Sequence, residues 1–434
     1  MFVGDAVSLN AVATSGLPVS FTSQTTTVCT IQGTTAYTIG AGTCTIQATQ
    51  AGSPTYAAAT PVSQSFTVSL RPQTITFIGP VGTQSAGTMV TLYATASSNL
   101  PVTFTSLTLP VCTVSGTTVS LLTSGTCTIQ ASQGGNYMYS PAAPVVQGFM
   151  VSPRMYVISG TNIEVFNSSG SFLFQFGGTG SGPGQFQLPS GITIDLAGNV
   201  WVTDASLNRV QKFDSNGNFL LQFGSTGTAA GFLYMPYGIA VDLYGNVWVA
   251  DTGNNRVEQF SPAGTYLREV GGLGGGNGQF NQPVGITFDT AHNLLVADTG
   301  NSRVQRFAMA GSTGVASSVS FLQQFATSGN GYVRLRGIYS ITVDPAGNIW
   351  VADSQNQRVA EFDSSGANLQ SAVGFSYPSP WGAAADGNGN IWAIDYNTNR
   401  VLEFNGAHAA QIFTFGTTGG GPGQLYHPTY IAVR

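Results

Sequence analysis

The feature that most constrains this fold is a segment that occurs five times in the last two thirds of the chain. Residues 191–204 read GITIDLAGNVWVTD, residues 238–251 read GIAVDLYGNVWVAD, and related segments begin at Gly285, Ser340 and Gly382. Each segment ends in Asp, and an Arg-Val pair begins five residues later. A strand ending in Phe, a turn that contains Gly and another apolar strand follow. Four short strands in each unit of about 42 to 55 residues predict the blades of a β-propeller.

The two ends of this region predict how the ring closes. Residues 155–158, 163–166 and 172–176 match the second, third and fourth strands of a blade that has no first strand. Residues 428–433, PTYIAV, match a first strand alone. Joined, the two parts complete a sixth blade, and closure protects strand edges that would otherwise stay open. We therefore expect a six-bladed propeller over residues 154–434, closed by the C-terminal strand.

The motif GIxxDxxGNxWVxDxxxxRV resembles the NHL repeat, and this resemblance extends over about 280 residues. Some NHL propellers, the peptide-amidating lyases, hold zinc through His side chains at the ring axis. Here His292 and His408 lie in turns on one face and His427 lies on the other, so the three do not converge easily. HExxH, GxSxG and Walker motifs are missing from the sequence. We therefore assign no catalytic residue, metal or cofactor, and keep a propeller lyase or hydrolase with a site at the axis as an alternative.

A second repeat occupies the first third of the chain. Residues 4–69 align with residues 87–152 after a shift of 83 positions, without a gap. Short alternating strands between Gly and Pro turns predict two β-sandwiches, over residues 1–70 and 71–153, which resemble bacterial immunoglobulin-like modules. The second copy opens with the strand Gln73–Ile78, for which the first has no room before Met1. Either the chain is a fragment, or the first sandwich has an open edge through which the chain self-associates.

All four cysteines lie in these copies, at the same spacing in each. Four cysteines allow three pairings, and the repetition favours Cys29–Cys44 and Cys112–Cys127 over a metal site, because CxxC spacing and nearby His are missing. Disulfides indicate an oxidising compartment, so we expect an extracellular or cell-surface bacterial protein.

Charged residues are scarce, and their distribution excludes several partners. The chain has 13 Lys and Arg against 18 Asp and Glu, a net charge of −5, and only Asp5 and Arg71 are charged before residue 150. Nucleic-acid phosphate is therefore a poor partner. The sequence also contains no stretch of about twenty apolar residues that would predict a membrane span.

The repeated Asp and Arg residues are predicted to be structural, because an active site needs asymmetry and these residues recur in every full unit. We expect each Asp to cap the turn between the second and third strands and each Arg to begin the third strand beside it. The pairs are Asp204/Arg209, Asp251/Arg256, Asp298/Arg303, Asp353/Arg358 and Asp395/Arg400.

Departures from the repeat point instead to one face of the ring. The connections from the fourth strand of one blade to the first strand of the next share a face with the turns between strands two and three. Two of these connections differ in sequence from the others. The candidate ligand-binding residues there are Arg334, Arg336, Tyr377, Trp381, Tyr426 and Tyr430. Aromatic residues with Arg suit protein or carbohydrate recognition, and packing between blades is the alternative role for them.

Together these patterns predict a non-enzymatic, secreted or surface-attached binding protein, with a propeller as its recognition head on a stalk of two sandwiches. A structural subunit of a surface assembly is a further alternative.

Overall fold

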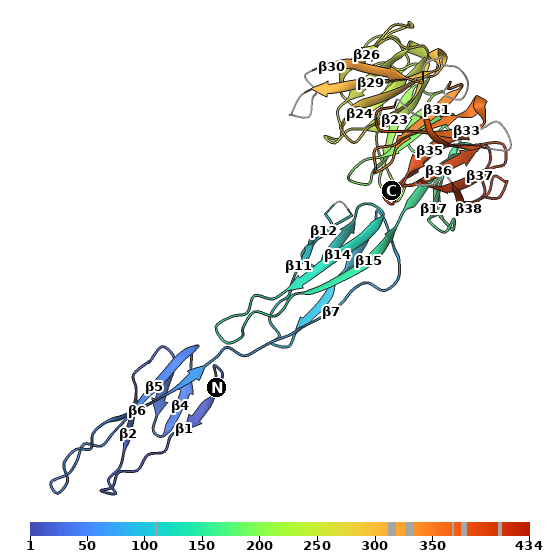
Figure 1. The fold of residues 1–434 in the computed structure, drawn as a ribbon. Coiled ribbons are helices and arrows are strands. Elements are labelled where there is room, and N and C mark those ends of the chain that lie inside the picture. The colour runs from blue at the N-terminus through green and yellow to red at the C-terminus, as the bar shows by residue number, and fades with distance from the viewer. Residues whose placement is uncertain (110, 311–317, 327–333, 367–368, 375–379, 407–409) are drawn as a thin grey trace.

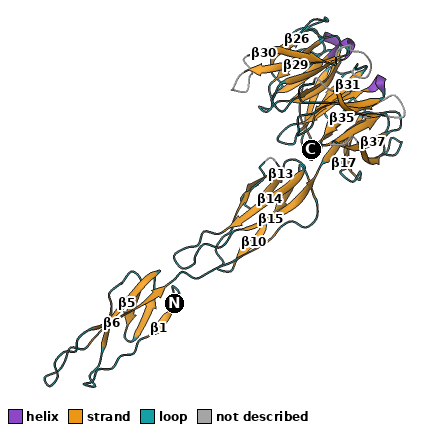
Figure 2. Cartoon of the chain, in the orientation of Figure 1, coloured by secondary structure: helices purple, strands orange, loops and turns teal. Residues whose placement is uncertain are grey.

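The computed structural model describes residues 1–434 apart from 110, 311–317, 327–333, 367–368, 375–379 and 407–409. Strands dominate, and the described helices are three single turns in the larger body (Figure 2). The molecule is elongated: two small β-bodies follow one another and lead to a larger body that holds the C-terminus (Figure 1). The prediction of an all-β chain is confirmed. No helix in the described ranges is long and apolar enough to cross a membrane.

The first β-body consists of two three-stranded sheets, in the orders β1-β4-β3 and β2-β5-β6. A disulfide between Cys29 and Cys44, as predicted, joins β3 to β5 and thereby links the two sheets. Val3, Ile46 and Val68 are buried around it. The strands are β1 (Ala6–Ser8), β2 (Ser20–Ser23), β3 (Cys29–Gln32), β4 (Thr35–Thr38), β5 (Gly42–Thr49) and β6 (Val62–Val68).

The second β-body repeats this arrangement with an additional two-stranded sheet. Its sheets have the orders β10-β7, β11-β14-β15-β8 and β12-β13-β9. The predicted disulfide between Cys112 and Cys127 again joins the two larger sheets. The strands are β7 (Ile75–Ile78), β8 (Gln84–Ser85), β9 (Met89–Thr91), β10 (Tyr93–Ala96), β11 (Thr103–Ser106), β12 (Cys112–Ser115), β13 (Thr118–Leu121), β14 (Gly125–Ser132) and β15 (Val145–Ser152).

The larger body contains six four-stranded antiparallel sheets among the described residues, which are the blades of a propeller. Five blades run in chain order. They comprise β19 (Pro189–Ile194), β20 (Val200–Asp204), β21 (Arg209–Phe213) and β22 (Phe219–Phe223); β23 (Pro236–Val241), β24 (Val247–Asp251), β25 (Arg256–Phe260) and β26 (Tyr266–Gly271); β27 (Pro283–Phe288), β28 (Leu294–Asp298), β29 (Arg303–Ala310) and β30 (Ser318–Phe325); β31 (Ile338–Val343), β32 (Ile349–Asp353), β33 (Arg358–Phe362) and β34 (Leu369–Gly374); and β35 (Pro380–Ala385), β36 (Asn390–Asp395), β37 (Arg400–Asn405) and β38 (Ala410–Phe415). The helical turns η1 (Thr252–Asn254), η2 (Thr299–Asn301) and η3 (Ser354–Asn356) each follow the second strand of a blade.

The sixth blade is built from both ends of this region. Its strands β16 (Arg154–Ser159), β17 (Asn162–Asn167) and β18 (Phe172–Gly177) are completed by β39 (Pro428–Val433), in the order β18-β17-β16-β39. Val433 pairs with Met155 and Ile431 pairs with Val157, in antiparallel register. The predicted closure by the C-terminal strand is therefore present.

The repeated motif explains how each blade is held together. The second strand lies between neighbouring strands and neighbouring blades, and β20, β24, β28 and β32 are buried along their whole length. A buried Trp in this strand needs a partner for its indole N–H. Trp201 donates to Asp195 at 3.0 Å and Trp248 donates to Asp242 at 3.1 Å. The same Asp residues accept the backbone N–H of Asn199 and Asn246. Asp, Asn and Trp of the motif thus form one structural unit at the turn between the first two strands.

Candidate functional site

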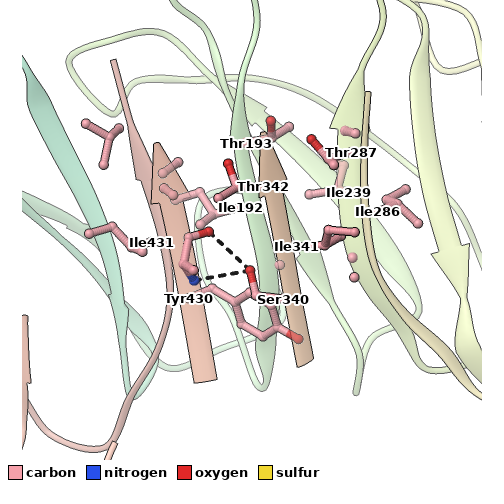
Figure 3. Close-up of a pocket in the computed structure, with 18 of the residues that line it drawn as sticks. Ile192, Thr193, Ile239, Ile286, Thr287, Ser340, Ile341, Thr342, Tyr430 and Ile431 are labelled. Atoms are coloured by element: carbon pink, nitrogen blue, oxygen red, sulfur yellow. Dashed lines mark hydrogen bonds between the residues drawn. The ribbon is translucent and has the colours of Figure 1, made fainter. Parts of the chain in front are cut away.

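The first strands of the blades surround the propeller axis and leave little space there. Gly191 and Gly238 allow neighbouring strands to approach closely, because a Cβ atom at either position would collide with a backbone carbonyl of the next blade. The remaining cavity, of about 170 Å³, is lined by apolar and hydroxyl-bearing side chains such as Ile286 and Thr287 (Figure 3). Its lining contains no Asp, Glu, His, Cys, Lys or Arg. The polar groups of this lining are therefore hydroxyls and backbone groups, without a charged side chain.

Tyr430 of β39 closes the end of this cavity that faces away from the second β-body. We call this end, and the face of the propeller around it, the upper one. It replaces the Gly of the repeat, and its hydroxyl donates to the carbonyl oxygen of Tyr339 at 3.0 Å, two blades away. Tyr430 packs with Val284, which comes from the opposite blade, and is buried. Burial, with the nearby phenols of Tyr237 and Tyr339, holds the pKa of Tyr430 well above its usual value. A neutral phenol thus fills the centre of the ring.

The second β-body covers the lower end. Thr123 lies beside the turns of several blades in a depression of about 370 Å³, which also includes Asp289 and Asp344. Arg434 donates to the carbonyl oxygen of Leu122, and Ser124 accepts the N–H of Gly387 at 3.0 Å. The lower face is therefore occupied in part by the chain itself.

Five aromatic side chains form a continuous stack on the upper face, which we call the aromatic ladder. Ring centroids are separated by 4.7 Å between Tyr339 and Trp381, 4.7 Å between Trp381 and Tyr396, and 4.8 Å between Tyr396 and His427. The three pairs are nearly parallel, with interplanar angles of 7°, 16° and 11°. Tyr426 ends the ladder, 4.4 Å from His427, and is 54% exposed.

The ladder lies on one side of the upper face because its residues differ from those at the same repeat positions in the other blades. Tyr339 lies in β31 and Trp381 in β35, while Tyr396 directly follows β36, and Tyr426 and His427 directly precede β39. At the position of Tyr396, the other full units have small residues, which are Ala205, Thr252, Thr299 and Ser354. The ladder therefore belongs to two full blades and the closing strand, and it breaks the symmetry of the ring.

Two exposed arginines precede the ladder along the chain. The backbone N–H of Arg336 donates to Asp353 at 2.6 Å, and the carbonyl oxygen of Arg334 accepts from the amide of Asn356 at 2.7 Å. The backbone of this connection is thus fixed to its blade. Within the described part of the chain, neither guanidinium has an acidic partner within 4.0 Å, and both residues are exposed.

The predicted binding residues are only partly brought together. Trp381 and Tyr426 lie in the ladder, Arg334 and Arg336 lie in the connection that leads to it, and Tyr430 is buried at the axis. Tyr377 falls outside the described residues, as does His408. Sequence reasoning missed the other three ladder residues, Tyr339, Tyr396 and His427. Tyr396 could have been found, because it is the one large residue at its repeat position.

The repeated Asp and Arg residues fix the connections between blades. Arg256 contacts Asp251 at 2.8 Å and donates to the carbonyl oxygens of Ala229 and Phe232 in the preceding connection. The Asp251 carboxylate accepts the N–H of Tyr234. Comparable Arg–Asp contacts, both of 2.7 Å, occur in the blades of Asp298/Arg303 and Asp353/Arg358.

In the blade of Asp204 and Arg209, each of the two residues binds the preceding connection separately. Asp204 accepts the N–H groups of Gln187 and Leu188, while Arg209 donates to the carbonyl oxygens of Ser181 and Gln185. Here the two residues hold the same connection from different points. In both arrangements the charged groups are used within the blade, which supports the structural interpretation.

Metal-ligating residues do not gather in the described ranges, where no group of three or more His, Cys, Asp or Glu could hold a metal ion. Burial raises the pKa of Glu258 and of Glu403 to about 7. Both residues belong to third strands, away from the axis, so these shifts mark buried blade positions.

Comparison with known families finds NHL repeats at residues 233–260 and 280–307, and a 6-bladed β-propeller at residues 150–224. No curated protein matches the chain. Among solved structures, one from a nidogen–laminin complex has 18% identity and a TM-score of 0.49, covering 65% of this chain and 98% of that one.

Two further structures have similar coverage. A catalytically inactive virginiamycin B lyase from Staphylococcus aureus, solved with quinupristin, has 14% identity and a TM-score of 0.42, covering 64% of this chain and 78% of its own. A protein of unknown function from Bacteroides caccae has 12% identity and a TM-score of 0.45, covering 65% and 99%.

Proposed function

We propose that this chain is a non-enzymatic binding protein whose propeller recognises a partner protein at the aromatic ladder and at Arg334 and Arg336. In this proposal residues 154–434 are the recognition head. Residues 1–70 and 71–153 are two immunoglobulin-like domains that act as a stalk on a secreted or surface-attached bacterial protein. The two disulfides support an oxidising compartment.

The observation that carries the proposal is the asymmetry of the upper face. Aromatic residues and Arg are enriched at the energetic centres of protein interfaces. A repeat position that only supports a blade would have the same kind of residue in each unit. Tyr396 and His427 do not follow the repeat. Trp381 and Tyr396 are partly exposed, and Tyr426 is 54% exposed, so a partner can reach this surface.

The stacking favours a protein partner over a carbohydrate. A sugar ring that stacks on an aromatic residue needs a free ring face. Both faces of Trp381 are covered, by Tyr339 on one side and Tyr396 on the other. Arg334 and Arg336 add positive charge, so an acidic segment that also carries apolar side chains would complement this surface.

The test is selection of a phage-displayed random peptide library on the full chain, followed by affinity measurements with the selected peptides. Tyr426→Ala and Arg334→Ala should each weaken binding about tenfold or more, as expected for interface centres. Tyr244→Ala is the matched control, because Tyr244 is also 54% exposed but lies in a turn of the opposite face.

Two outcomes would contradict the proposal. In the first, Tyr244→Ala abolishes binding while Tyr426→Ala and Arg334→Ala bind normally. Recognition would then take place on the opposite face of the propeller. In the second, a glycan array gives saturable ligands that require Tyr426, while no selected peptide binds. The recognition face would then be correct, but the partner would be a carbohydrate.

A further inference from the structure

A largely apolar pocket of about 250 Å³ lies on the lower face, between the blade β23-β26 and the blade β27-β30. Its lining includes Leu243 and Tyr244 from one blade and Phe288 and Met309 from the other. Leu243 and Tyr244 are 52% and 54% exposed, so the pocket is accessible to solvent. Asp242 is the one carboxylate among the described lining residues, which include no Lys or Arg. The pocket thus combines apolar walls with a single negative charge.

Three departures from the repeat build this pocket. Tyr244 stands where the other full units have small or amide residues, which are Ala197, Ala291, Ala346 and Asn388. His292, also in the lining, has a left-handed backbone with a φ of 63°, and the other units have the glycine that this conformation favours, at Gly198, Gly245, Gly347 and Gly389. Met309 lies in β29, which has eight residues, whereas the third strands of the other blades have five or six. Positions that only support a blade would follow the repeat.

The neighbouring blades show how this chain balances the charge of the Asp that follows each first strand. Lys212 lies 3.7 Å from the carboxylate of Asp195 and 4.5 Å from the ring centroid of Trp201. In the blade β27-β30, Arg306 contacts the carboxylate of Asp289 at 3.2 Å. In both blades a cation from the third strand therefore neutralises the Asp, and in one of them this cation also lies over an aromatic ring.

Asp242 belongs to the blade between these two and is satisfied differently. Its third strand has Gln259 at the equivalent position, which donates to the carboxylate at 3.3 Å and adds no charge. Among the described residues, no Lys, Arg or His lies within 4.0 Å of this carboxylate. The carboxylate oxygens also accept N–H groups from Tyr244, Asn246 and Trp248. The site therefore has hydrogen-bond donors but lacks a positive charge.

These properties together favour one class of ligand. A quaternary ammonium group carries a positive charge, has an apolar surface and donates no hydrogen bond. It therefore suits apolar walls beside a carboxylate whose oxygens already accept several N–H groups. Aromatic rings such as those of Tyr244 and Phe288 attract such a cation through their faces. A primary amine would instead bring three N–H donors, for which Asp242 has little acceptor capacity left.

We propose that this pocket binds a quaternary ammonium group such as that of choline. The group would lie against Tyr244, Phe288 and Met309, with Asp242 as its counter-charge. Choline exists as a free compound and as the head group of phosphatidylcholine, and the chemistry that the pocket recognises is the same in both. This site lies on the opposite face from the aromatic ladder and does not rest on the function proposed for that face.

The test is isothermal titration calorimetry of the full chain with choline and with 3,3-dimethylbutan-1-ol, a neutral compound of nearly the same shape. Choline should bind saturably at one site per chain, and the alcohol should bind at least tenfold more weakly. Tyr244→Leu keeps an apolar side chain but removes the ring, and should weaken choline binding about tenfold. Gln259→Lys should weaken it as strongly, because the new ammonium would neutralise Asp242 as Lys212 neutralises Asp195.

Two controls accompany these measurements. Tyr426→Ala, on the upper face, should leave choline binding unchanged. Thermal unfolding followed by tryptophan fluorescence shows whether Gln259→Lys is folded, and the comparison of choline with the alcohol needs no variant. Sedimentation with phosphatidylcholine vesicles then identifies the source of the ligand. Vesicle binding that free choline displaces would assign a lipid head group, whereas choline binding without vesicle binding would assign a free compound.

Three results would overturn the proposal. They are an absence of saturable choline binding, equal affinity for choline and the alcohol, and choline binding that neither Tyr244→Leu nor Gln259→Lys weakens. None of them affects the function proposed for the upper face, because peptide binding there is measured separately and depends on Tyr426 and Arg334.

Discussion

At the scale of single residues, Glu258 shows what happens when a repeat position changes its chemistry. Gln211 and Gln305 occupy this position in neighbouring blades, and each accepts a glycine N–H from a connection, at 2.8 and 2.9 Å. Glu258 accepts the N–H of Gly231 at 3.0 Å, while its other oxygen has no hydrogen-bond partner among the described residues. Burial raises the pKa of Glu258 to about 7. The carboxylate also contacts Arg256 at 3.1 Å, but burial outweighs this contact, so Glu258 places a costly carboxylate where the neighbouring blades have an amide.

Glu258→Gln is expected to stabilise the propeller at and above neutral pH. With a folded-state pKa of about 7 and an ordinary value of 4.5, the folded state binds the extra proton. The wild type therefore loses stability as pH rises from about 4.5 to 7, by roughly 1 to 3 kcal/mol. The variant should melt several degrees higher at pH 8 and about equally at pH 4. Tryptophan fluorescence measures this transition, because all five Trp residues lie in the propeller. The reverse change, Gln305→Glu, should lower the melting temperature at pH 8. If the melting temperature depends on pH in the same way in both variants and the wild type, then the raised pKa of Glu258 does not destabilise the propeller.

The residue scale also shows what the sequence could and could not predict. The structural role of the Asp/Arg pairs followed from their repetition, and Arg256, Arg303 and Arg358 contact their Asp partners as expected. The aromatic ladder was only partly predicted. Trp381 and Tyr396 are 15 residues apart, and their stacking depends on side-chain directions at the ends of two different strands, which the period alone does not specify.

At the scale of elements, β39 combines three roles in six residues. It completes the sheet β18-β17-β16-β39, supplies the tyrosine that fills the axis, and leads to Arg434, whose backbone pairs with Arg154 at 2.8 and 3.0 Å. The sequence predicted the first role, because an incomplete blade at one end matched a single strand at the other. It did not predict that Tyr430 would be buried, since this residue stands where the other blades have glycine or serine.

Removal of residues 426–434 should lower the melting temperature of the propeller by many degrees. The deletion exposes β16 as an open edge and empties the centre of the ring, where burying Tyr430 contributes several kcal/mol. Tryptophan fluorescence again reports the propeller alone. Deletion of residues 1–8, which removes β1 from the first body, is the control and should leave this transition in place. An unchanged transition after removal of 426–434 would mean that β39 does not close the ring.

At the scale of the whole molecule, the same repeat position forms both joints of the elongated chain. Arg71 and Arg154 are related by the 83-residue shift, and each follows the last strand of a β-body. Arg71 pairs with Asp5 and donates to the carbonyl oxygen of Val3 at 3.0 Å, while its own N–H donates to Met138 of the second body at 2.8 Å. The only two charged residues before residue 150 therefore meet at the first joint.

The second joint uses hydrogen bonds, and in the described part of the chain Arg154 forms no ion pair. Ser215 of the propeller donates to the carbonyl oxygen of Gly87 in the second body at 3.3 Å, and Arg154 of β16 holds Ser215 by donating to its carbonyl oxygen at 2.9 Å. Across the joint, Arg434 donates to the carbonyl oxygen of Leu122. Within the propeller, the carbonyl oxygens of Asp195 and Leu196, both at 2.6 Å, fix the same guanidinium. Because these acceptors are backbone carbonyls and Arg434 is buried, salt should affect this joint little. We therefore expect the second body and the propeller to move as one unit.

Arg71→Ala should loosen the first joint and leave the second unchanged. The Arg71–Asp5 pair is partly exposed, with side chains 36% and 27% accessible, so salt screens it and it contributes about 1 kcal/mol or less. Small-angle X-ray scattering should then show a broader distribution of maximum dimensions for the variant than for the wild type. High salt should change the wild type in the same direction and the variant very little. Arg434→Ala should broaden the distribution to a similar extent at any salt concentration, because it removes an uncharged-acceptor contact between the propeller and Leu122 of the second body. If Arg71→Ala and the wild type scatter identically at low salt, the orientation of the first body depends on the strand connection alone, and the Arg71–Asp5 pair has no part in it.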